Sequence, residues 1–233
     1  MTATLDKRPA AIQRMFTDIA VRYDLLNRLI SLGFDQSLRR QMIALLAGRD
    51  PKRITDIGCG TGDVSILLAK TFPGCQILAC DMTLAMIQVG RKRTQNPAVQ
   101  WVVCDSSQLP FESEIMDAIT SAFLLRNVAD LGAVLQEQSR ITKPNGTFLT
   151  LETTPPRKTL LYPFIWLYYH TVIPLLGWLV AGKPGAYQYL PDSSLEFVSA
   201  EQLSQQVGLN GWQQAHMERK FFGIMAIHQA QKK

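Results

Sequence analysis

The residues with the clearest chemical potential in this sequence are three aspartates, each at the end of an apolar run. The first, Asp56, opens the segment DIGCGTGD at residues 56–63. Gly58 and Gly60 let the backbone approach a ligand, and Gly62 allows the next helix to pack closely. A dinucleotide site spaces its glycines GxGxxG, so that a pyrophosphate meets a helix N-terminus, whereas the spacing here is GxGxG. Asp56 beside such a turn suits a ligand with a positive amino group and no phosphate.

Two further aspartates end the next two apolar runs. Asp81 lies 19 residues after Gly62, where an acid typically binds ribose hydroxyls. Asp105 follows in CDSSQLPF, close enough to accept a hydrogen bond from an adenine amino group. Each position alone is also explained by an ordinary helix cap. Taken together, the three strand ends could bind the amino group, the ribose and the adenine of one ligand that has no phosphate. The ligand with these parts is S-adenosylmethionine.

Bringing these aspartates together requires parallel strands, and the rest of the chain predicts them. Strands are expected at residues 53–58, 77–81, 101–105, 115–123 and 147–152, and helices at 12–46 (broken at 31–33), 64–72, 86–93 and 128–142. Alternating strands and helices indicate a parallel sheet covered on both faces. The carboxyl ends of its strands would place all three aspartates at one edge.

The C-terminal residues predict a different kind of pairing. Ser199, with Gln202 three residues later, is typical of a capping box that starts a polar helix. Runs at 212–222 and 223–230 then indicate two strands whose short connection forces antiparallel pairing. The expected fold is α/β, with a doubly wound, seven-stranded, mostly parallel sheet. It is Rossmann-like and resembles the class I methyltransferases.

Composition narrows the class of protein further. The chain has 233 residues, of which 47% are hydrophobic, and no linker-like or repeated segment, so we expect a single domain over 1–233. Its net charge of +5 permits an anionic partner without requiring one. Four cysteines without a CxxC pair or a neighbouring histidine favour reduced thiols and no metal site. The N-terminal residues lack an apolar core typical of a signal peptide, which favours a cytoplasmic protein.

Several features of the sequence argue against nucleic acid as the methyl acceptor. The segment AFLLRN at 122–127 lacks the NPPY-type motif of adenine methylation, and no cysteine follows Cys104 to serve as a nucleophile for pyrimidine methylation. No aromatic residues interleave with basic ones to stack bases. The run GRKR at 90–93 is interpreted as a solvated helix face. We therefore expect no nucleic-acid partner.

An ordered set of segments resembles one family along nearly the whole chain, the ubiquinone/menaquinone biosynthesis C-methyltransferases. The set is YDLLNRLISLGFD (23–35), DIGCGTGD, LPF (109–111), LLRNVAD (124–130), KPNG (143–146), LETTPP (151–156) and YQYLPDS (187–193). The resemblance implies metal-free, S-adenosylmethionine-dependent methylation of a prenylated quinol ring. The acceptor would be demethylmenaquinol, a 2-polyprenyl-6-methoxy-1,4-benzoquinol, or both. Ring type and tail length stay open.

The resemblance also assigns residues. It implies that Thr61 and Asp81, with the adjacent Met82, contact the cofactor, and that Asp105 and Ser106 lie beside the adenine. Arg126 and Asn127 would face the acceptor. The family usually has Ser-Phe-Gly where this chain has Ala122-Phe123-Leu124, which leaves the exact acceptor open. KPNG in place of KPGG is a mild change, because asparagine tolerates left-handed conformations.

A stretch without charged side chains, residues 160–182, is long enough to span a bilayer. Pro163 and Pro174 would break a straight helix, and His170 would place a polar group near its middle. We interpret residues 157–190 as an apolar lid of proline-broken helices inserted after strand five, and residues 1–50 as an N-terminal helical cap. The lid would cover the quinol pocket and dock peripherally on the membrane surface, with Arg157, Lys158 and Lys183 meeting anionic headgroups.

The expected chemistry is attack on the activated methyl by a ring carbon made nucleophilic through loss of the adjacent hydroxyl proton. Arg126 would lower the phenol's pKa and Asn127 would orient the hydroxyl. His170 is a candidate general base, although a structural histidine is the commoner reading. Tyr23, Asp24, Tyr187 and Tyr189 are further pocket candidates.

Two alternatives remain open. The chain could methylate another lipid, such as a sterol, or a small metabolite, or it could be a non-catalytic scaffold of a quinone-synthesis complex. The intact glycine turn and the Arg126-Asn127 pair argue against the scaffold. A homodimer and such a complex are both open as assemblies, as is the identity of the base.

Overall fold

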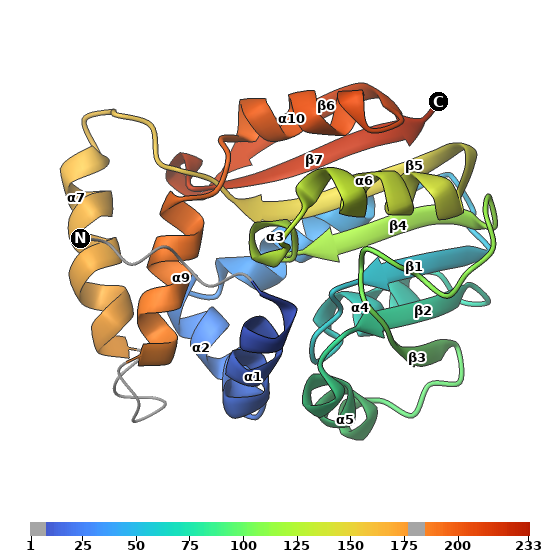
Figure 1. Cartoon of the computed structure of the whole chain (residues 1–233), viewed down its shortest axis with the longest axis horizontal. Coiled ribbons are helices and arrows are strands. Elements are labelled where there is room, and N and C mark those ends of the chain that lie inside the picture. The colour runs from blue at the N-terminus through green and yellow to red at the C-terminus, as the bar shows by residue number, and fades with distance from the viewer. Residues whose placement is uncertain (1–7, 177–184) are drawn as a thin grey trace.

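A computed structural model describes residues 8–176 and 185–233. At its centre is a seven-stranded sheet with the order β3-β2-β1-β4-β5-β7-β6 (Figure 1). Parallel pairing joins β3 through β5, and β7 runs antiparallel to both β5 and β6. The strands are β1 (Arg53–Ile57), β2 (Gln76–Asp81), β3 (Val99–Val103), β4 (Met116–Ala122), β5 (Thr142–Thr153), β6 (Trp212–Lys220) and β7 (Met225–Lys232). This sheet confirms the doubly wound α/β fold that the sequence predicts.

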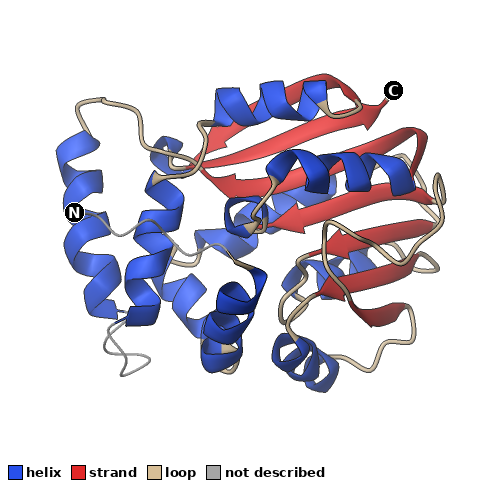
Figure 2. Ribbon diagram, viewed as in Figure 1, coloured by secondary structure: helices blue, strands red, loops and turns tan. Residues whose placement is uncertain are grey.

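Helices cover both faces of the sheet, because its strands alternate apolar side chains between two cores (Figure 2). One core joins the sheet to α3 (Phe34–Ala44), α4 (Asp63–Thr71) and α5 (Leu84–Arg93). The other joins it to α6 (Leu131–Ile141) and α10 (Ala200–Leu209). Within β1, for instance, Ile54 belongs to the first core and Ile57 to the second. Ser199 and Gln202 form the predicted capping box at the start of α10.

The strand order reverses between β1 and its two neighbours, β2 and β4. In doubly wound sheets, ligands bind outside the carboxyl ends of strands at such a switch point. In Figure 1 the arrowheads of β1 and β4 point toward the side where α1 (Pro9–Ile19), α2 (Tyr23–Ile30), α7 (Tyr162–Leu167) and α9 (Gly185–Leu195) lie. The fold therefore gathers the predicted site residues beneath the N-terminal helices.

Two local features differ from the sequence prediction. The N-terminal helical region breaks at residues 20–22 as well as at 31–33, giving three helices where two were expected. The strand pairing of β5 skips from Thr142 to Thr147, so KPNG loops out after the strand has already begun. Asn145 has φ +61°, the left-handed conformation expected of an asparagine in this turn.

The apolar stretch is helical, but its second proline does not break it. Pro163 lies in the first turn of α7, where a missing N–H costs nothing. A π-helical segment, η2 (Tyr168–Val172), precedes Pro174, and the helix then continues to residue 176. The wider turn absorbs the lost hydrogen bond, which corrects the prediction of a break there. Residues 177–182 of the stretch, with Trp178, and Lys183 lie outside the described part. No described helix is both long and apolar enough to cross a bilayer.

Candidate active site

A cavity of about 230 Å³ opens at the carboxyl ends of β1, β2 and β4. Apolar side chains of α1 and α2 cover it from one side, and the loops after the strands form the rest. Its walls include the predicted residues Gly58, Gly60, Asp81, Met82, Asp105, Ser106 and Asn127, together with Pro9, Ile12, Phe16 and Tyr23 of the cover. The structure thus brings most of the predicted cofactor residues to one site.

Asp81 binds the glycine turn directly. Its Oδ2 accepts a hydrogen bond from the Gly60 N–H at 2.8 Å, and its Oδ1 accepts one from the Thr83 N–H at 2.8 Å. Burial raises the pKa of this carboxyl, while the two backbone donors oppose the rise. A carboxylate offers about four acceptor positions, so two remain for ribose hydroxyls.

Two glycines of the turn accommodate large neighbours. A Cβ on Gly58 would lie 2.7 Å from Cδ1 of Leu124, the residue that replaces the family's usual glycine. A Cβ on Gly62 would lie 2.4 Å from Cη2 of Trp101. Gly62 lies outside the cavity. It allows close packing, as predicted, but the group that packs against it is the side chain of a strand residue and not a helix. Gly60 is open, because a Cβ there would meet only the Tyr23 ring at 3.9 Å.

Asp56 is buried behind the turn and does not line the large cavity. Its Oδ2 accepts from the Ser65 hydroxyl at 2.5 Å and its Oδ1 from the Thr120 hydroxyl at 3.1 Å. Burial raises its pKa to about 6, against the effect of these hydrogen bonds. With Thr61 it lines a smaller adjoining cavity that also includes Gly58 and Gly60. A direct contact between Asp56 and an amino group stays a prediction.

Thr61 is committed to protein contacts. Its hydroxyl donates to Oδ1 of Asp24 at 2.5 Å and accepts from Nη1 of Arg93 at 3.0 Å. The side chain is buried and faces α2 rather than the large cavity. It therefore holds the turn against the N-terminal helices, and its predicted contact with the cofactor is untested.

The adenine end of the site is polar and accessible. Oδ1 of Asp105 accepts from both the backbone N–H and the hydroxyl of Ser107, each at 2.8 Å, which fixes the carboxylate at the cavity wall. Ser106 lines the same wall. The carbonyl of Met82 accepts from Nε2 of Gln13 at 2.8 Å, which connects this wall to α1.

Arg126 lies in a second, smaller cavity on the lid side. Its walls include Tyr168, Tyr169 and Ile173 of the apolar stretch, and Phe123 lines both this cavity and the large one. Nη1 of Arg126 pairs with Oε2 of Glu152 at 3.2 Å, and both side chains are at most 3% exposed. Among the described residues, Nε of Arg126 is buried without a hydrogen-bond partner. This N–H is therefore a donor that no described residue satisfies.

Asn127 and Tyr189 connect the strand end to α9. The Asn127 amide donates to the Phe123 carbonyl at 2.9 Å and accepts from the Tyr189 hydroxyl at 2.9 Å. Burial raises the pKa of Tyr189 to about 12, so this hydroxyl stays protonated and remains a donor. Asn127 therefore orients Tyr189 and the loop carrying Phe123.

His170 is not brought to either cavity. Its side chain is exposed, its ring stacks on Trp166 with centroids 4.2 Å apart, and its Nδ1 lies 2.8 Å from the Trp166 carbonyl. This geometry corrects the assignment of His170 as candidate base, because helical spacing places it on the outer side with Trp166.

Glu152 and Phe123 were quoted within motifs but were not predicted to have site roles. Glu152 is 26 residues from Arg126 and accepts from the Leu125 N–H as well. Phe123 has φ +62°, and the guanidinium carbon of Arg126 lies 5.2 Å from its ring centroid. The sequence did contain a signal for Glu152, because this acidic residue ends a predicted central strand. A buried acid needs a partner, so a pairing with a basic residue could have been predicted.

The large cavity fits S-adenosylmethionine by the chemistry of its walls. Asp81 has acceptor capacity left for a ribose, Asp105 offers a carboxylate to an adenine, and Gly60 exposes backbone without a side chain. The apolar cover from α1 suits the uncharged parts of such a ligand. This sheet order, with that cavity at its switch point, defines a class I methyltransferase.

Comparison with known proteins identifies the family. The sequence model of the ubiE/COQ5 methyltransferase family matches residues 1–232, and the chain belongs to that family. It is 38% identical over 224 residues to the ubiquinone/menaquinone biosynthesis C-methyltransferase UbiE of Desulfotalea psychrophila, covering 96% of this chain and 91% of that protein. It is also 38% identical over 216 residues to the demethylmenaquinone methyltransferase of Thermus thermophilus, covering 92% and 98%.

Solved structures agree on the fold. One of them, a SAM-dependent methyltransferase of Thermotoga maritima described as a possible histamine N-methyltransferase, superposes with a TM-score of 0.68. The sequences are 18% identical, and the match covers 95% of this chain and all of that one. The chain is thus an S-adenosylmethionine-dependent C-methyltransferase of quinone biosynthesis.

Proposed function

We propose that the acceptor is demethylmenaquinol, and that the cavity beside Arg126 receives its ring. Several relatives named demethylmenaquinone methyltransferase support the naphthoquinol. The observation that carries the proposal is Arg126, whose side chain lines the second cavity and whose buried Nε has no hydrogen-bond partner among the described residues. A phenolate oxygen is the partner that such a charged donor favours. The benzoquinol is the second candidate, because the Desulfotalea relative is named for both quinones.

The proposed chemistry divides between the cofactor and the chain. S-adenosylmethionine supplies a methyl group that is already activated for transfer. The ring hydroxyl loses its proton to water, and Arg126 stabilises the resulting oxyanion, whose charge makes the adjacent carbon nucleophilic. The C–CH3 bond forms as the S–CH3 bond breaks, and the ring carbon then loses its own proton to water, which restores the aromatic ring. Glu152 holds the guanidinium in place, and its carbon lies 5.2 Å from the ring centroid of Phe123, a residue that lines both cavities. Alignment of carbon and methyl would supply most of the rate enhancement.

We propose that the tail of the quinol is drawn from a bilayer on which the protein docks from the cytoplasm. The described part of the lid exposes apolar side chains, including Leu160 at 96% and Phe164 at 70%. A second surface lies at α2, where Leu25 and Leu29 are exposed one helical turn apart, and Val21 and Leu32 are exposed in the turns on either side of this helix. The Tyr168 hydroxyl donates to the Ile30 carbonyl, which ties the lid to α2.

Deleting the gene tests the acceptor. Mass spectrometry of the lipid extract should show a naphthoquinone that is one methyl short, restored by the wild-type gene. Accumulation of a demethylated benzoquinone with normal menaquinone would contradict the assignment of the ring.

Arg126→Ala tests the role of the second cavity. We expect turnover of a short-chain demethylmenaquinol to fall about 100-fold, the usual effect of removing one preorganised charge donor. Affinity for S-adenosylhomocysteine should change little, and Arg49→Ala on a distant loop is the matched control. If turnover persists and only the Michaelis constant for quinol rises, Arg126 binds the substrate without stabilising the anion.

A further inference from the structure

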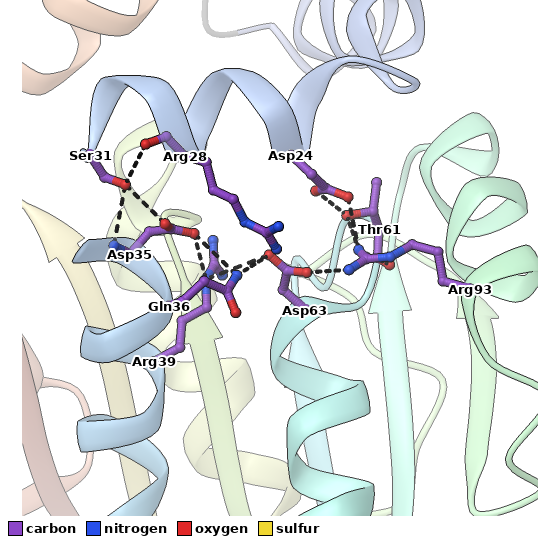
Figure 3. Close-up of polar contacts among 9 residues, drawn as sticks. All are labelled: Asp24, Arg28, Ser31, Asp35, Gln36, Arg39, Thr61, Asp63 and Arg93. Carbon is purple, nitrogen blue, oxygen red and sulfur yellow. Dashed lines mark hydrogen bonds and ion pairs between the residues drawn. The ribbon is translucent and has the colours of Figure 1, made fainter. Parts of the chain in front are cut away.

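Arg93 ends α5 within the run GRKR, which the sequence indicates as a solvated face. Arg91 and Lys92 are exposed, as expected. The guanidinium of Arg93 instead lies among α2, the glycine turn and the start of α4, and its side chain is only 30% exposed (Figure 3). The same run therefore contains two solvated cations and one that joins three elements.

The contacts of Arg93 are numerous and short. Its Nη1 donates to Oδ2 of Asp24 at 2.9 Å, and to the Thr61 carbonyl and hydroxyl at 2.9 and 3.0 Å. Its Nη2 donates to Oδ1 of Asp63 at 2.5 Å. Asp24 belongs to α2, Thr61 to the turn and Asp63 to the first turn of α4. One planar cation thus satisfies acceptors that three separate elements contribute.

A second row of contacts extends this network to α3. Oδ2 of Asp63 accepts from Nε2 of Gln36 at 2.9 Å and lies 3.9 Å from Nε of Arg39 (Figure 3). Arg39 also approaches Asp35, whose Oδ1 accepts from the Ser31 hydroxyl. The whole group connects the N-terminal helices to the strand that carries the glycine turn.

Arg93 is one of the cations that compensate this acidic group. Its Nη1 pairs with Asp24 and its Nη2 with Asp63, and although burial opposes ionisation of Asp63, Arg39 and Arg93 together lower its pKa. Burial raises the pKa of Asp24, the charge of Asp63 raises it further, and Arg93 opposes both. Removing the guanidinium would leave less positive charge to offset the repulsion between Asp24 and Asp63, and would remove the donor that they share with Thr61, which weakens the link between α2 and the turn.

The network lies directly behind the cofactor cavity. Tyr23 precedes Asp24 and Gly60 precedes Thr61, and both Tyr23 and Gly60 line that cavity. We propose that Arg93 is a positioning residue, which holds α2 over the cofactor cavity and fixes the glycine turn for S-adenosylmethionine. The proposal rests on cofactor binding alone and does not depend on the identity of the acceptor.

Calorimetry with S-adenosylhomocysteine tests it without any quinol. Arg93→Ala should weaken binding about tenfold, the size of a typical coupling between neighbouring charged groups. Lys92→Ala removes the same charge from the same helix and should leave affinity unchanged. Arg93→Lys keeps the charge but not the fork of donors, so its affinity should be intermediate. Circular dichroism and melting temperature report whether each variant is folded.

A double-mutant cycle with Asp24→Asn separates positioning from general stabilisation of α5. In the Asp24→Asn background the repulsion is absent, so Arg93→Ala should weaken binding by less than about threefold. Equal losses in both backgrounds, or unchanged affinity in folded Arg93→Ala, would overturn the proposal. Should Arg93→Ala fail to fold, Arg93→Lys decides, because affinity equal to the wild type would show that the fork of contacts positions nothing.

Discussion

Asp56 and Asp81 are the same residue type on neighbouring strands, yet their partners give them different behaviour. Asp81 accepts two backbone N–H groups beside a cavity, and although burial raises its pKa, these donors oppose the rise. Asp56 accepts two hydroxyls in the interior, where burial raises its pKa to about 6. A strand-end aspartate is therefore a ligand-binding group only where the backbone turn leaves it an open side.

Replacing Asp81 by Asn should weaken S-adenosylhomocysteine binding. The amide loses a charged acceptor for ribose hydroxyls and presents a donor toward one of the two backbone N–H groups. A loss of about 3 kcal/mol is expected for charge-assisted bonds. Calorimetry measures it, with Glu112→Gln, an exposed acid away from the cavity, as control. Unchanged affinity would remove Asp81 from the cofactor site.

Asp56→Asn should change how stability depends on pH. Because the pKa of Asp56 is about 6 in the folded chain and 3.8 in the reference state, the folded state holds the proton more tightly between these values. The contribution of Asp56 to stability is thus present below about pH 4 and is lost as pH rises toward 6, by about 3 kcal/mol.

Urea denaturation of wild type and variant from pH 4 to 7 measures this. The free energy of unfolding of wild type minus that of Asp56→Asn should fall across the window and level off above it. A constant difference would show that Asp56 is ionised throughout and that its burial has little effect on its proton affinity.

Sequence patterns predicted the polar residues near the cofactor but not their partners. Asp81, Asp105 and Asn127 could be placed because strand ends and motif positions are local properties. The pairing of Arg126 with Glu152, and of Arg93 with Asp24, depends on which strands and helices become neighbours. The position of His170 could not be predicted for a related reason. The lid sequence is apolar on every side of its helix, so it does not show which side is buried and which is exposed.

At the scale of elements, Trp101 shows how the sheet edge is sealed. A Cβ on Gly62 would lie 2.4 Å from Cη2 of its indole, and a Cβ on Gly90 would lie 2.2 Å from the same atom. The indole of this strand residue therefore packs against Gly62 at the start of α4 and against Gly90 within α5. Both glycines are needed for this packing for steric reasons. Gly62 additionally has φ +86°, which disfavours any other residue.

Gly62→Ala should therefore destabilise the fold more than its backbone angle alone predicts. Gly74→Ala is a matched control, because Gly74 has φ +89° with no heavy atom within 4 Å of an added Cβ. Overpacking typically costs about 1–3 kcal/mol, which should appear as the difference between the two variants in urea denaturation. Trp101→Leu should reduce that difference, and equal losses for the two variants would contradict steric contact as the cause.

The sequence predicted those helices and strands that are marked by apolar runs, turn residues or capping residues. It did not predict features that depend on contacts with distant parts of the chain. The five parallel strands and the capping box of α10 follow from apolar runs and turn residues. The break at residues 20–22 has no glycine or proline to mark it. The π-helical turn before Pro174 depends on how the chain compensates for the lost N–H, which composition does not specify.

For the whole molecule, the distribution of exposed apolar side chains argues for an oriented attachment to lipid. Many of them belong to the described part of the lid and to α2 with the turns on either side of it, and Figure 1 shows α7 and α2 at the same end of the molecule. One expected headgroup contact changes, because Arg157 pairs with Glu201 and is partly neutralised. Lys158 is exposed at the lid's start, and its contact with anionic headgroups stays a prediction.

Replacing Leu160 and Phe164 together with Ser should weaken binding to vesicles containing anionic phospholipid. Burying such side chains at an interface stabilises attachment by about 1–2 kcal/mol each, so affinity should fall at least about tenfold. Cosedimentation with vesicles measures it. Leu209→Ser is the matched control, because Leu209 is 76% exposed at the end of α10, apart from the lid.

The same variants distinguish attachment from catalysis. Methylation of a tail-less quinol in solution should be nearly unaffected by the lid substitutions, whereas methylation of a long-tailed quinol in vesicles should fall with binding, because only that substrate must be taken from lipid. In cells, a docked protein should be released from membranes by alkaline washing. If it resists that wash and requires detergent, residues 160–182 cross the bilayer and the docking proposal is wrong. If Leu209→Ser weakens vesicle binding as much as the lid pair does, attachment is non-specific and the lid has no special part in it.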